Sequence, residues 1–374
     1  MMANPRKQCR RIMSGSLVWA AMGLIFLPLS YGASSSGATK GTAKKPQTVA
    51  EIAQYKGADR QQILEEGARK EGRFVWYTSM NERWSRNISR EFQKRYPFIK
   101  SELYRATSED VIQRYVAESK GKRGGADLIN VSALDFQALL DEDLLQPFYT
   151  PEAEAYTPYL KDPKGFWVSN RINAFSVAYN RNQLKTEDLP KTYEDFLHPR
   201  WKGKIAIEES DNDWFFMLMN HWGKQKGTEY FTKLGGQNLQ TRRGHSNLLN
   251  LLVAGEYPLV LTNYAYLAVN FEEEKKAPVG SYYLKPTPVR TEPTGLPKSA
   301  NHPFSAMLFM DFLLSKDTQQ RIANEGEMAA HPQVKMRAKL ASYRDNEPTV
   351  FDAAKAVPVW NQYVELYDKL LLKR

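Results

Sequence analysis

Short apolar segments alternate with amphipathic segments between residues 73 and 132, and this alternation constrains the fold more than any other feature of the sequence. The pattern predicts strands at residues 74–77, 99–104 and 127–132 and helices at residues 84–96 and 111–119. Pro97 supports the end of the first helix because the residue before a proline disfavours helical geometry. The β-α-β-α-β order predicts an α/β fold with a parallel sheet and crossover helices.

Length and charge narrow the possibilities further. The chain has 374 residues, of which 42% are hydrophobic and 25% are charged, as is typical of a folded globular protein. Chains beyond roughly 250–300 residues usually divide their interior, so two lobes are expected. The formal net charge is +10, but four of the basic residues lie in an N-terminal leader. The basic cluster at residues 120–123 has no aromatic platform beside it, and we expect no nucleic acid partner.

Residues 1–33 have the three zones of a secretory signal peptide: a basic start, an apolar run of 13 residues and a small-residue exit near Gly32 and Ala33. The apolar run is shorter than the roughly 20 residues of a membrane-spanning helix. We expect cleavage and a periplasmic location, with an uncleaved anchor as the alternative. Residues 34–48 predict a flexible tether, and folded structure is expected to begin near Val49. The single cysteine, Cys9, lies in the leader, so the mature chain has no disulfide.

Common catalytic motifs are missing from the sequence. It contains no phosphate-binding G-x-x-x-x-G-K, no dinucleotide-binding G-x-G-x-x-G, no H-E-x-x-H helix and no G-x-S-x-G turn. Its five histidines are dispersed without the spacing of a metal site. We therefore expect a protein that is not an enzyme and has no cofactor.

Polar residues gather where expected strands end and helices begin. In open α/β sheets, ligands bind outside the carboxyl ends of the strands, and hydroxyl, amide, phenol and guanidinium groups there suit a small polar solute. The candidate ligand-binding residues are Tyr77, Thr78, Ser79, Asn81, Ser132, Ser210, Asp211, Trp214, Arg243, His245, Asn263, Tyr264 and Tyr266. Ser132, Ser210 and Asp211 are also suited to helix N-caps. Trp214 is also suited to a core, and only one of Tyr264 and Tyr266 is expected to reach the cleft.

Several motifs resemble those of extracellular solute-binding proteins. They include Phe-Val-Trp-Tyr-Thr-Ser at residues 74–79, Trp-Lys-Gly-Lys-Ile-Ala at residues 201–206 and His-Pro-Phe-Ser-Ala at residues 302–306. The last is followed by Asp-Phe-Leu-Leu-Ser-Lys at residues 311–316. The resemblance covers roughly residues 72–335 and is strongest to the ferric-iron-type periplasmic binding proteins of ABC importers.

The resemblance implies a type II periplasmic-binding-protein fold, in which each of two lobes has a mainly parallel sheet flanked by helices and the ligand cleft lies between them. It also implies a monomer that closes on its solute and delivers it to an ABC permease in the inner membrane. The expected segments are lobe 1 at residues 49–175, lobe 2 at 176–268, a return to lobe 1 and hinge at 269–335, and a C-terminal helical segment at 336–374. The chain is expected to cross between the lobes near residues 175 and 268.

The ligand has three candidate classes. The acidic stretch at residues 209–211 favours a ligand with a positive or donor group, whereas Arg242 and Arg243 favour an organic carboxylate or phosphonate. A zwitterion satisfies both. Iron-binding relatives carry two adjacent tyrosines after an asparagine, and the corresponding stretch here is Asn263-Tyr264-Ala265-Tyr266. Ferric iron, as a transported ligand held by Tyr264 or Tyr266, is therefore the alternative. A ligand sensor for a membrane receptor and a secreted enzyme are less favoured functions.

Overall fold

The computed structural model describes residues 46–121 and 125–373. The predicted signal peptide and most of the predicted tether lie outside the described residues. The first helix, α1 (Val49–Ala53), is capped by Thr48, whose side chain accepts a hydrogen bond from the backbone N–H of Glu51. Among the helices in the described part of the chain, none is both long and apolar enough to span a membrane.

Strands and helices alternate along most of the described chain. The strands are β1 (Arg73–Thr78), β2 (Lys100–Arg105), β3 (Leu128–Asn130), β4 (Leu145–Gln146), β5 (Val168–Asn180), β6 (Ile205–Glu208), β7 (Gln240–Arg242), β8 (Leu259–Tyr264), β9 (Val279–Tyr282), β10 (Thr287–Pro297) and β11 (Pro348–Val350). The α-helices after α1 are α2 (Arg60–Glu71), α3 (Glu82–Arg95), α4 (Ser108–Lys120), α5 (Ala133–Asp141), α6 (Asn212–Trp222), α7 (Lys224–Gly235), α8 (His245–Ala254), α9 (Ala265–Glu273), α10 (Pro303–Leu314), α11 (Lys316–Asn324), α12 (Ala338–Ala341), α13 (Ala353–Ala356) and α14 (Trp360–Tyr367).

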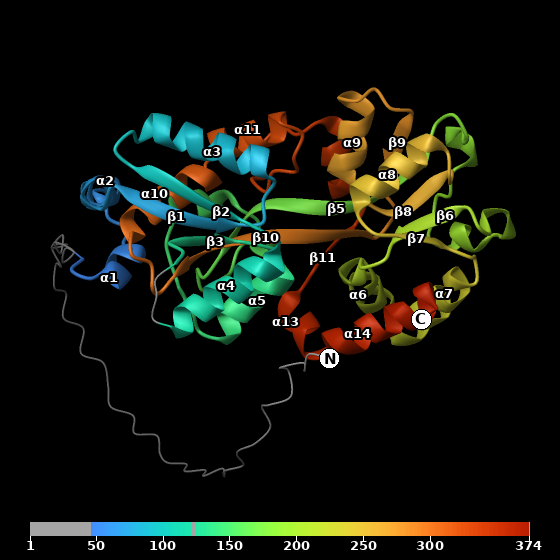
Figure 1. Ribbon diagram of the computed structural model, residues 1–374, viewed down its shortest axis with the longest axis horizontal. Helices are drawn as coiled ribbons and strands as arrows, with labels where there is room; N and C mark the ends of the chain where they lie inside the picture. The colour runs from blue at the N-terminus through green and yellow to red at the C-terminus, as the bar shows by residue number, and fades with distance from the viewer. Residues whose placement is uncertain (1–45, 122–124, 374) are drawn as a thin grey trace, which may run out of the picture. The chain divides into compact units, whose positions relative to one another are not determined.

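The sheet confirms the parallel arrangement that the sequence predicts. β1 lies between β2 and β3 and pairs in parallel with both. The sheet continues in the order β2-β1-β3-β10-β5-β8-β6-β7 (Figure 1). We refer to β1–β4 with α1–α5, α10 and α11 as lobe 1, and to β6–β9 with α6–α9 as lobe 2. Each lobe has a largely parallel set of strands with helices packed against it.

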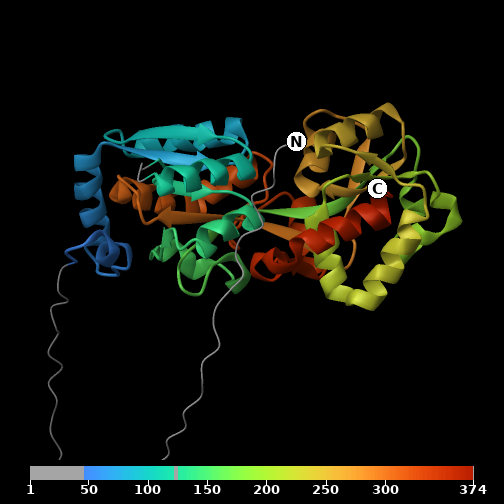
Figure 2. The same ribbon diagram turned by 60° about the horizontal axis from the view of Figure 1, so that its bottom comes forward.

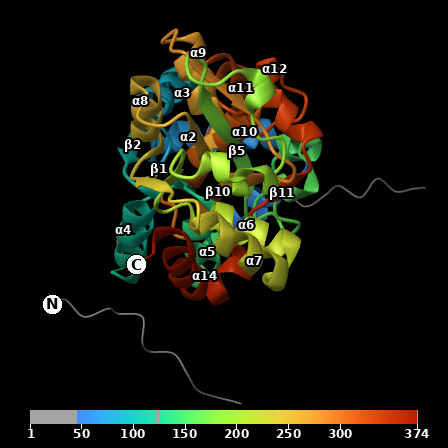
Figure 3. The same ribbon diagram turned by 90° about the vertical axis from the view of Figure 1, so that its right-hand side faces the viewer.

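Two long strands, β5 and β10, run through both lobes. They pair in antiparallel fashion from Val289 opposite Ala174 to Thr294 opposite Val168. β5 then continues into lobe 2, where it pairs with β8 and β9, while the end of β10 pairs with β3 and β4 in lobe 1. Figures 2 and 3 show these two strands passing between the helices of the molecule. We call β5 and β10 the hinge strands.

The structure corrects the expected second crossing near residue 268. That position lies inside α9, and β9 beyond it pairs with the lobe 2 end of β5. The second crossing is β10, which the sequence does not reveal because Pro288, Pro293 and Pro297 interrupt an otherwise strand-like segment. Lobe 2 therefore extends past the boundary expected from the sequence.

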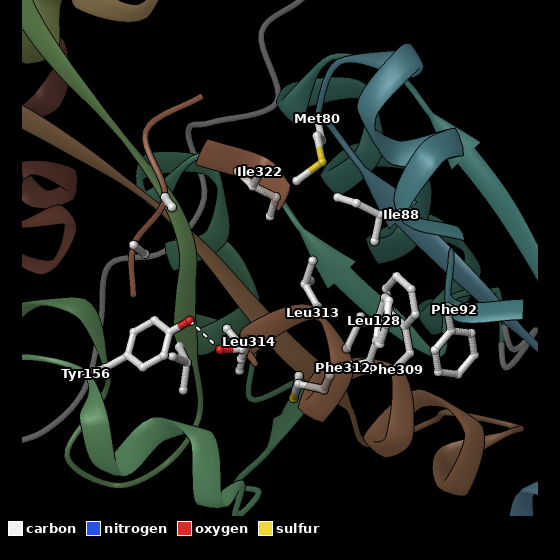
Figure 4. Packing of buried hydrophobic residues seen from close by; sticks show 14 of the residues in the cluster. Met80, Ile88, Phe92, Leu128, Tyr156, Phe309, Phe312, Leu313, Leu314 and Ile322 are labelled. Carbon is white, nitrogen blue, oxygen red and sulfur yellow. Dashed lines mark hydrogen bonds between the residues drawn. The ribbon is translucent and has the colours of Figure 1, made fainter. Parts of the chain in front are cut away.

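Large aromatic clusters fill the interior of each lobe. In lobe 1, the rings of Phe92 and Phe309 lie 5.0 Å apart, edge to face, and Figure 4 shows them beside Phe312. In lobe 2, Trp214 lies 5.4 Å from Phe231 and is only 1% exposed. Trp214 thus packs in the core because α6 is buried on nearly all sides, and the structure does not present its ring to a cleft.

The C-terminal segment joins both the hinge and lobe 2. β11 pairs in parallel with the start of β10, and Tyr363 of α14 packs against Phe216 of α6. Tyr367 is fully buried, and its hydroxyl donates a hydrogen bond to the carbonyl oxygen of Glu208, the last residue of β6. The segment predicted as helical therefore includes one strand as well as helices.

Candidate functional site

Charged and amide side chains cover one face of the hinge strands. Arg171 lies opposite Glu292, and Asn173 lies opposite Arg290. Directly opposed residues, and residues two apart on one strand, point to the same face of a sheet. The distance between Arg171 Nη2 and Glu292 Oε2 is 3.6 Å, and Asn173 Nδ2 donates to Glu292 Oε1 at 3.1 Å. We call Arg171, Asn173, Arg290 and Glu292 the hinge quartet.

Lobe 2 provides partners for Arg290 from one helix and one strand end. Its Nε lies 2.8 Å from Oδ2 of Asp213 on α6, and its Nη1 donates to the hydroxyl of Tyr264. The ring of Tyr264 stacks on His245, with 4.0 Å between ring centroids and 23° between ring planes. His245 in turn lies 3.1 Å from Asp211. These contacts join the ends of β8 and β6 and the start of α8 into one polar wall.

Burial shifts the pKa values of Asp211 and His245 in this wall. It raises the pKa of Asp211 to about 6, although His245 acts in the opposite direction. Burial also acts to lower the pKa of His245, but the neighbouring carboxylate of Asp211 outweighs it, so that pKa is raised. The raised pKa of His245 favours a charged imidazolium beside the carboxylate of Asp211.

Lobe 1 contacts the hinge quartet at Arg171. Arg171 Nη1 lies 3.2 Å from Oε2 of Glu327, in the segment that follows α11. Arg171 is 7% exposed and Glu327 is 1% exposed. Burial raises the pKa of Glu327 to about 7, against the lowering effect of Arg171. One guanidinium is therefore shared between the carboxylates of Glu292 and Glu327.

A small cavity of about 100 Å³ joins the lobes beside Arg290. Ser132 and Asp135 line it from lobe 1, and Ser210 and Asp213 line it from lobe 2. Both serine hydroxyls already donate hydrogen bonds within the chain, that of Ser132 to Asp135 and that of Ser210 to Glu208. Leu134, Phe351 and Trp360 add apolar lining, and Arg290 is the one guanidinium that the described residues place in the lining. The carboxylates and hydroxyl oxygens of the cavity suit a ligand that donates hydrogen bonds.

The structure brings six of the sequence-predicted residues to this region: Ser132, Ser210, Asp211, His245, Tyr264 and Tyr266. The rings of Tyr264 and Tyr266 are nearly parallel, with centroids 6.1 Å apart. Tyr266 also meets Trp84 of lobe 1. Ser132 is in addition the N-cap of α5 and accepts from the N–H of Asp135.

Four predicted residues lie in a different setting. Tyr77 is buried beside α4 and donates to Glu118 at 3.0 Å, and burial together with Glu118 raises the pKa of Tyr77 to about 12. Asn81 is exposed and caps α3, and the backbone N–H of Ser79 donates to the carbonyl oxygen of Asn130. Arg243 is exposed in the turn before α8. Local helix and strand geometry accounts for these positions.

Thr78 and Asn263 are fully buried. Thr78 donates to the side-chain oxygen of Asn130, whose Nδ2 donates to the carbonyl oxygens of Glu292 and Pro293. Asn263 donates to the carbonyl oxygen of Tyr264, and its own Oδ1 has no hydrogen-bond partner among the described residues. Thr78 therefore supports the hinge strand β10 through Asn130, and Asn263 supports the backbone at Tyr264.

Sequence reasoning missed the hinge quartet, Asp213 and Glu327. The sequence pattern pointed to residues at the junctions between strands and helices, whereas the quartet lies within the strands. A signal was present: Arg171-Ile172-Asn173 and Arg290-Thr291-Glu292 each place polar or charged residues two apart in segments that are otherwise buried. Paired polar positions of this kind on one strand face are expected to line a site.

Among the described residues, no group of three or more His, Cys, Asp or Glu side chains is arranged to hold a metal ion. The phenols of Tyr264 and Tyr266 are the remaining iron-binding candidates. Burial raises the pKa of both phenols, which favours their neutral form. Ligation of ferric iron there requires loss of a phenol proton.

Two α/β lobes that share two strands, with polar side chains over those strands, define the class of two-lobe periplasmic binding proteins. Within this class, the chain belongs to the bacterial extracellular solute-binding protein family, which it matches over residues 126–345. It is thus a solute-binding component of ABC transport, as the sequence predicted.

Curated relatives are similar over most of their length. The chain is 25% identical over 263 residues to iron uptake protein A1 of Synechocystis sp., covering 66% of this chain and 72% of the relative. It is 23% identical over 247 residues to an Fe(3+)-binding periplasmic protein of Serratia marcescens, covering 63% and 73% of the two chains. Both relatives are proteins of solute uptake or binding.

Solved structures share the fold. FutA of Trichodesmium, in complex with iron and citrate, superposes with a TM-score of 0.68 at 20% identity, covering 80% of this chain and 99% of that one. AfuA of Actinobacillus pleuropneumoniae, with fructose-6-phosphate bound, gives a TM-score of 0.63 at 20% identity, covering 80% and 99%. The same fold thus accommodates a metal complex in one protein and a sugar phosphate in another.

Proposed function

We propose that the protein captures a small zwitterionic solute between its lobes in the periplasm and delivers it, as a monomer, to an ABC permease in the inner membrane. The observation that carries the ligand class is the hinge quartet, which presents guanidinium and carboxylate groups on one strand face. Both signs of charge are therefore available to one ligand.

The distribution of charge favours a positive group on the ligand. Arg290 is engaged by Asp213 and Tyr264, and Arg171 is engaged by two glutamates. Glu292 Oε2 is buried and lies 3.6 Å from Arg171 Nη2, and it has no hydrogen-bond partner among the described residues. Buried acceptors of this kind favour a donor, so an ammonium group beside Glu292 completes the site.

The organic-anion class is less favoured than the sequence indicated. Its main support was Arg243, but this residue is exposed and takes no part in the contacts of the hinge quartet. The acidic group of a zwitterion instead shares the guanidinium of Arg290 with Asp213. Such sharing limits that group to a small one, such as a carboxylate.

Native mass spectrometry of the protein purified from a periplasmic fraction tests the proposal directly. We expect a co-purified zwitterion, and calorimetric titration with that compound should show that Glu292→Gln weakens binding about tenfold or more, the loss of one charged hydrogen bond. Arg243→Ala is the matched control and should bind as tightly as wild type. A co-purified dianion whose binding depends on Arg243 would contradict the proposal.

Ferric iron is a second candidate because relatives are described as iron-uptake and Fe(3+)-binding proteins and because Tyr264 and Tyr266 share the lobe 2 wall. Titration with ferric citrate, followed by visible absorption, separates the two candidates. A phenolate-to-iron absorption band that disappears in Tyr264→Phe or Tyr266→Phe supports iron. Absence of any band with the folded protein supports the zwitterion.

A further inference from the structure

We propose that a second cavity, between α3 and α11 of lobe 1, binds an amine with an apolar body, with the ammonium group at Glu327. The cavity has a volume of about 490 Å³, within the range of roughly 300–1,000 Å³ that is typical of small-molecule sites. Its walls come from lobe 1 and its inner end from the hinge, so the inference does not rest on the proposed capture between the lobes.

The middle of the cavity is apolar. Trp84 and Ile88 line it from α3, Ile322 lines it from α11, and Met80 and Phe312 complete the lining. Figure 4 shows Ile322 and Ile88 on opposite sides of this region, with Met80 between them. An aromatic or branched aliphatic group placed here would remove its own apolar surface from water.

The outer rim is charged, with three basic side chains (Arg90, Lys94 and Arg321) and two carboxylates (Glu91 and Glu325). Glu91 lies 2.6 Å from Lys94 and 3.5 Å from Arg321, and Asn87 donates to the carboxylate of Glu325. These side chains lie at the surface, where ion pairs contribute little. The rim therefore does not determine which charged group the cavity recognises.

The inner end supplies the recognition. Arg171 and Glu327 both line the cavity, and both are more than nine-tenths buried. Glu327 Oε2 is paired with Arg171, whereas Glu327 Oε1 has no hydrogen-bond partner among the described residues. A buried carboxylate oxygen without a partner favours a ligand group that donates hydrogen bonds.

The local charge selects an amine over an acid. One guanidinium, Arg171, faces the two carboxylates of Glu292 and Glu327. An ammonium group balances the additional negative charge, whereas a ligand carboxylate would place a third negative charge in the same buried region. The face of Trp84 at the same cavity also favours a cation over an anion.

Tryptamine is a suitable probe because it joins an aromatic body to a primary ammonium, and indole-3-propanoate is its matched acid. In calorimetric titrations of the full-length mature protein, we expect tryptamine to bind and indole-3-propanoate to bind at least tenfold more weakly. Glu327→Gln and the cavity-filling Ile322→Trp should each weaken tryptamine binding at least tenfold. Glu66→Gln, on the exposed side of α2, should leave it unchanged.

Wild-type protein provides a measurement that does not depend on the folding of variants. With isoleucine methyl groups labelled, nuclear Overhauser effects should join the indole protons of tryptamine to the methyl groups of Ile88 and Ile322. Failure of folded wild-type protein to bind tryptamine, equal binding of the acid, or contacts to neither isoleucine would overturn the inference. None of these outcomes affects the zwitterion test, which depends on Glu292 and on the co-purified solute.

Discussion

The ring of Tyr266 on α9 meets the ring of Trp84 on α3 edge to face, with 6.0 Å between their centroids. This contact joins the two lobes directly. Edge-to-face aromatic pairs contribute about 0.5–1.5 kcal/mol beyond the area that they bury. The pair therefore stabilises the arrangement in which the lobes lie close to the hinge quartet.

Replacing Tyr266 by Leu should favour separation of the lobes. Because closure contributes to affinity, loss of about 0.5–1.5 kcal/mol predicts solute binding roughly twofold to tenfold weaker. Small-angle scattering should show a smaller radius of gyration for wild type with its solute than without it, and a smaller change for the variant at the same solute concentration. An unchanged radius in wild type with proven binding would contradict closure.

Removal of Arg290 should destabilise the protein because it leaves Asp213 buried without its partner. Arg290→Met is expected to lower the free energy of unfolding by about 3–5 kcal/mol, the range for breaking one side of a buried ion pair. Asp213→Asn in the same chain should restore part of this loss. Denaturant unfolding of the two single variants and the double variant measures the coupling, and additive effects would show that the pair does not interact.

The two tyrosines of the lobe 2 wall should respond differently to loss of their hydroxyls. Tyr264→Phe removes the acceptor of a hydrogen bond from Arg290 and is expected to lower the free energy of unfolding by about 1.5–3 kcal/mol. No residue among 46–121 and 125–373 hydrogen-bonds to the hydroxyl of Tyr266, so Tyr266→Phe should change this free energy by no more than about 0.5 kcal/mol. Thermal and denaturant unfolding of both variants provide the comparison.

Glu327 should make stability depend on pH. Its pKa is raised from 4.5 to about 7, so the folded protein holds a proton that the unfolded chain releases above pH 4.5. The contribution of Glu327 therefore falls by about 3 kcal/mol as the pH rises from 4.5 through 7. Burial is the main cause of this shift in pKa; among the neighbouring groups, Arg171 opposes it, and Glu292 and Glu325 increase it.

A matched variant isolates this dependence from the other carboxyl groups. The free energy of unfolding of wild type relative to Glu327→Gln should decrease by about 3 kcal/mol between pH 4.5 and pH 7.5. The same comparison with Glu66→Gln, an exposed carboxyl on α2, should be nearly flat. A flat difference for Glu327→Gln would show that the buried carboxyl titrates normally.

The parallel sheet of lobe 1 was predictable because its strands and helices are local. β1 is a short apolar run, α3 and α4 carry apolar residues at helical spacing, and the crossover topology follows from the order of the elements. β10 was not predictable in this way. Its prolines lie within a strand that is held by partners far away in the sequence, including Val289 opposite Ala174.

The site was only partly predictable for a similar reason. Ser132, Ser210 and Tyr264 were predictable because they lie at strand ends, where ligands generally bind in α/β sheets. Arg290 and Glu292 depend on the pairing of β10 with β5, which brings together residues more than 100 positions apart. Trp214 and Tyr77 were predicted from strand-to-helix junctions of the same kind, but long-range packing places their rings in the interior.

The helical turn at Asp368–Leu372, which follows α14, is attached to lobe 2. This attachment has a practical consequence. Tyr367 and Leu371 are buried in the lobe 2 core, while Lys369 between them is exposed. Gln62 is exposed on α2 in lobe 1. Since Cys9 is the only cysteine in the chain, two fluorophores on cysteines introduced at Gln62 and Lys369, with Cys9 replaced, would each report one lobe. Energy transfer between them would turn the protein into an optical sensor of its own solute.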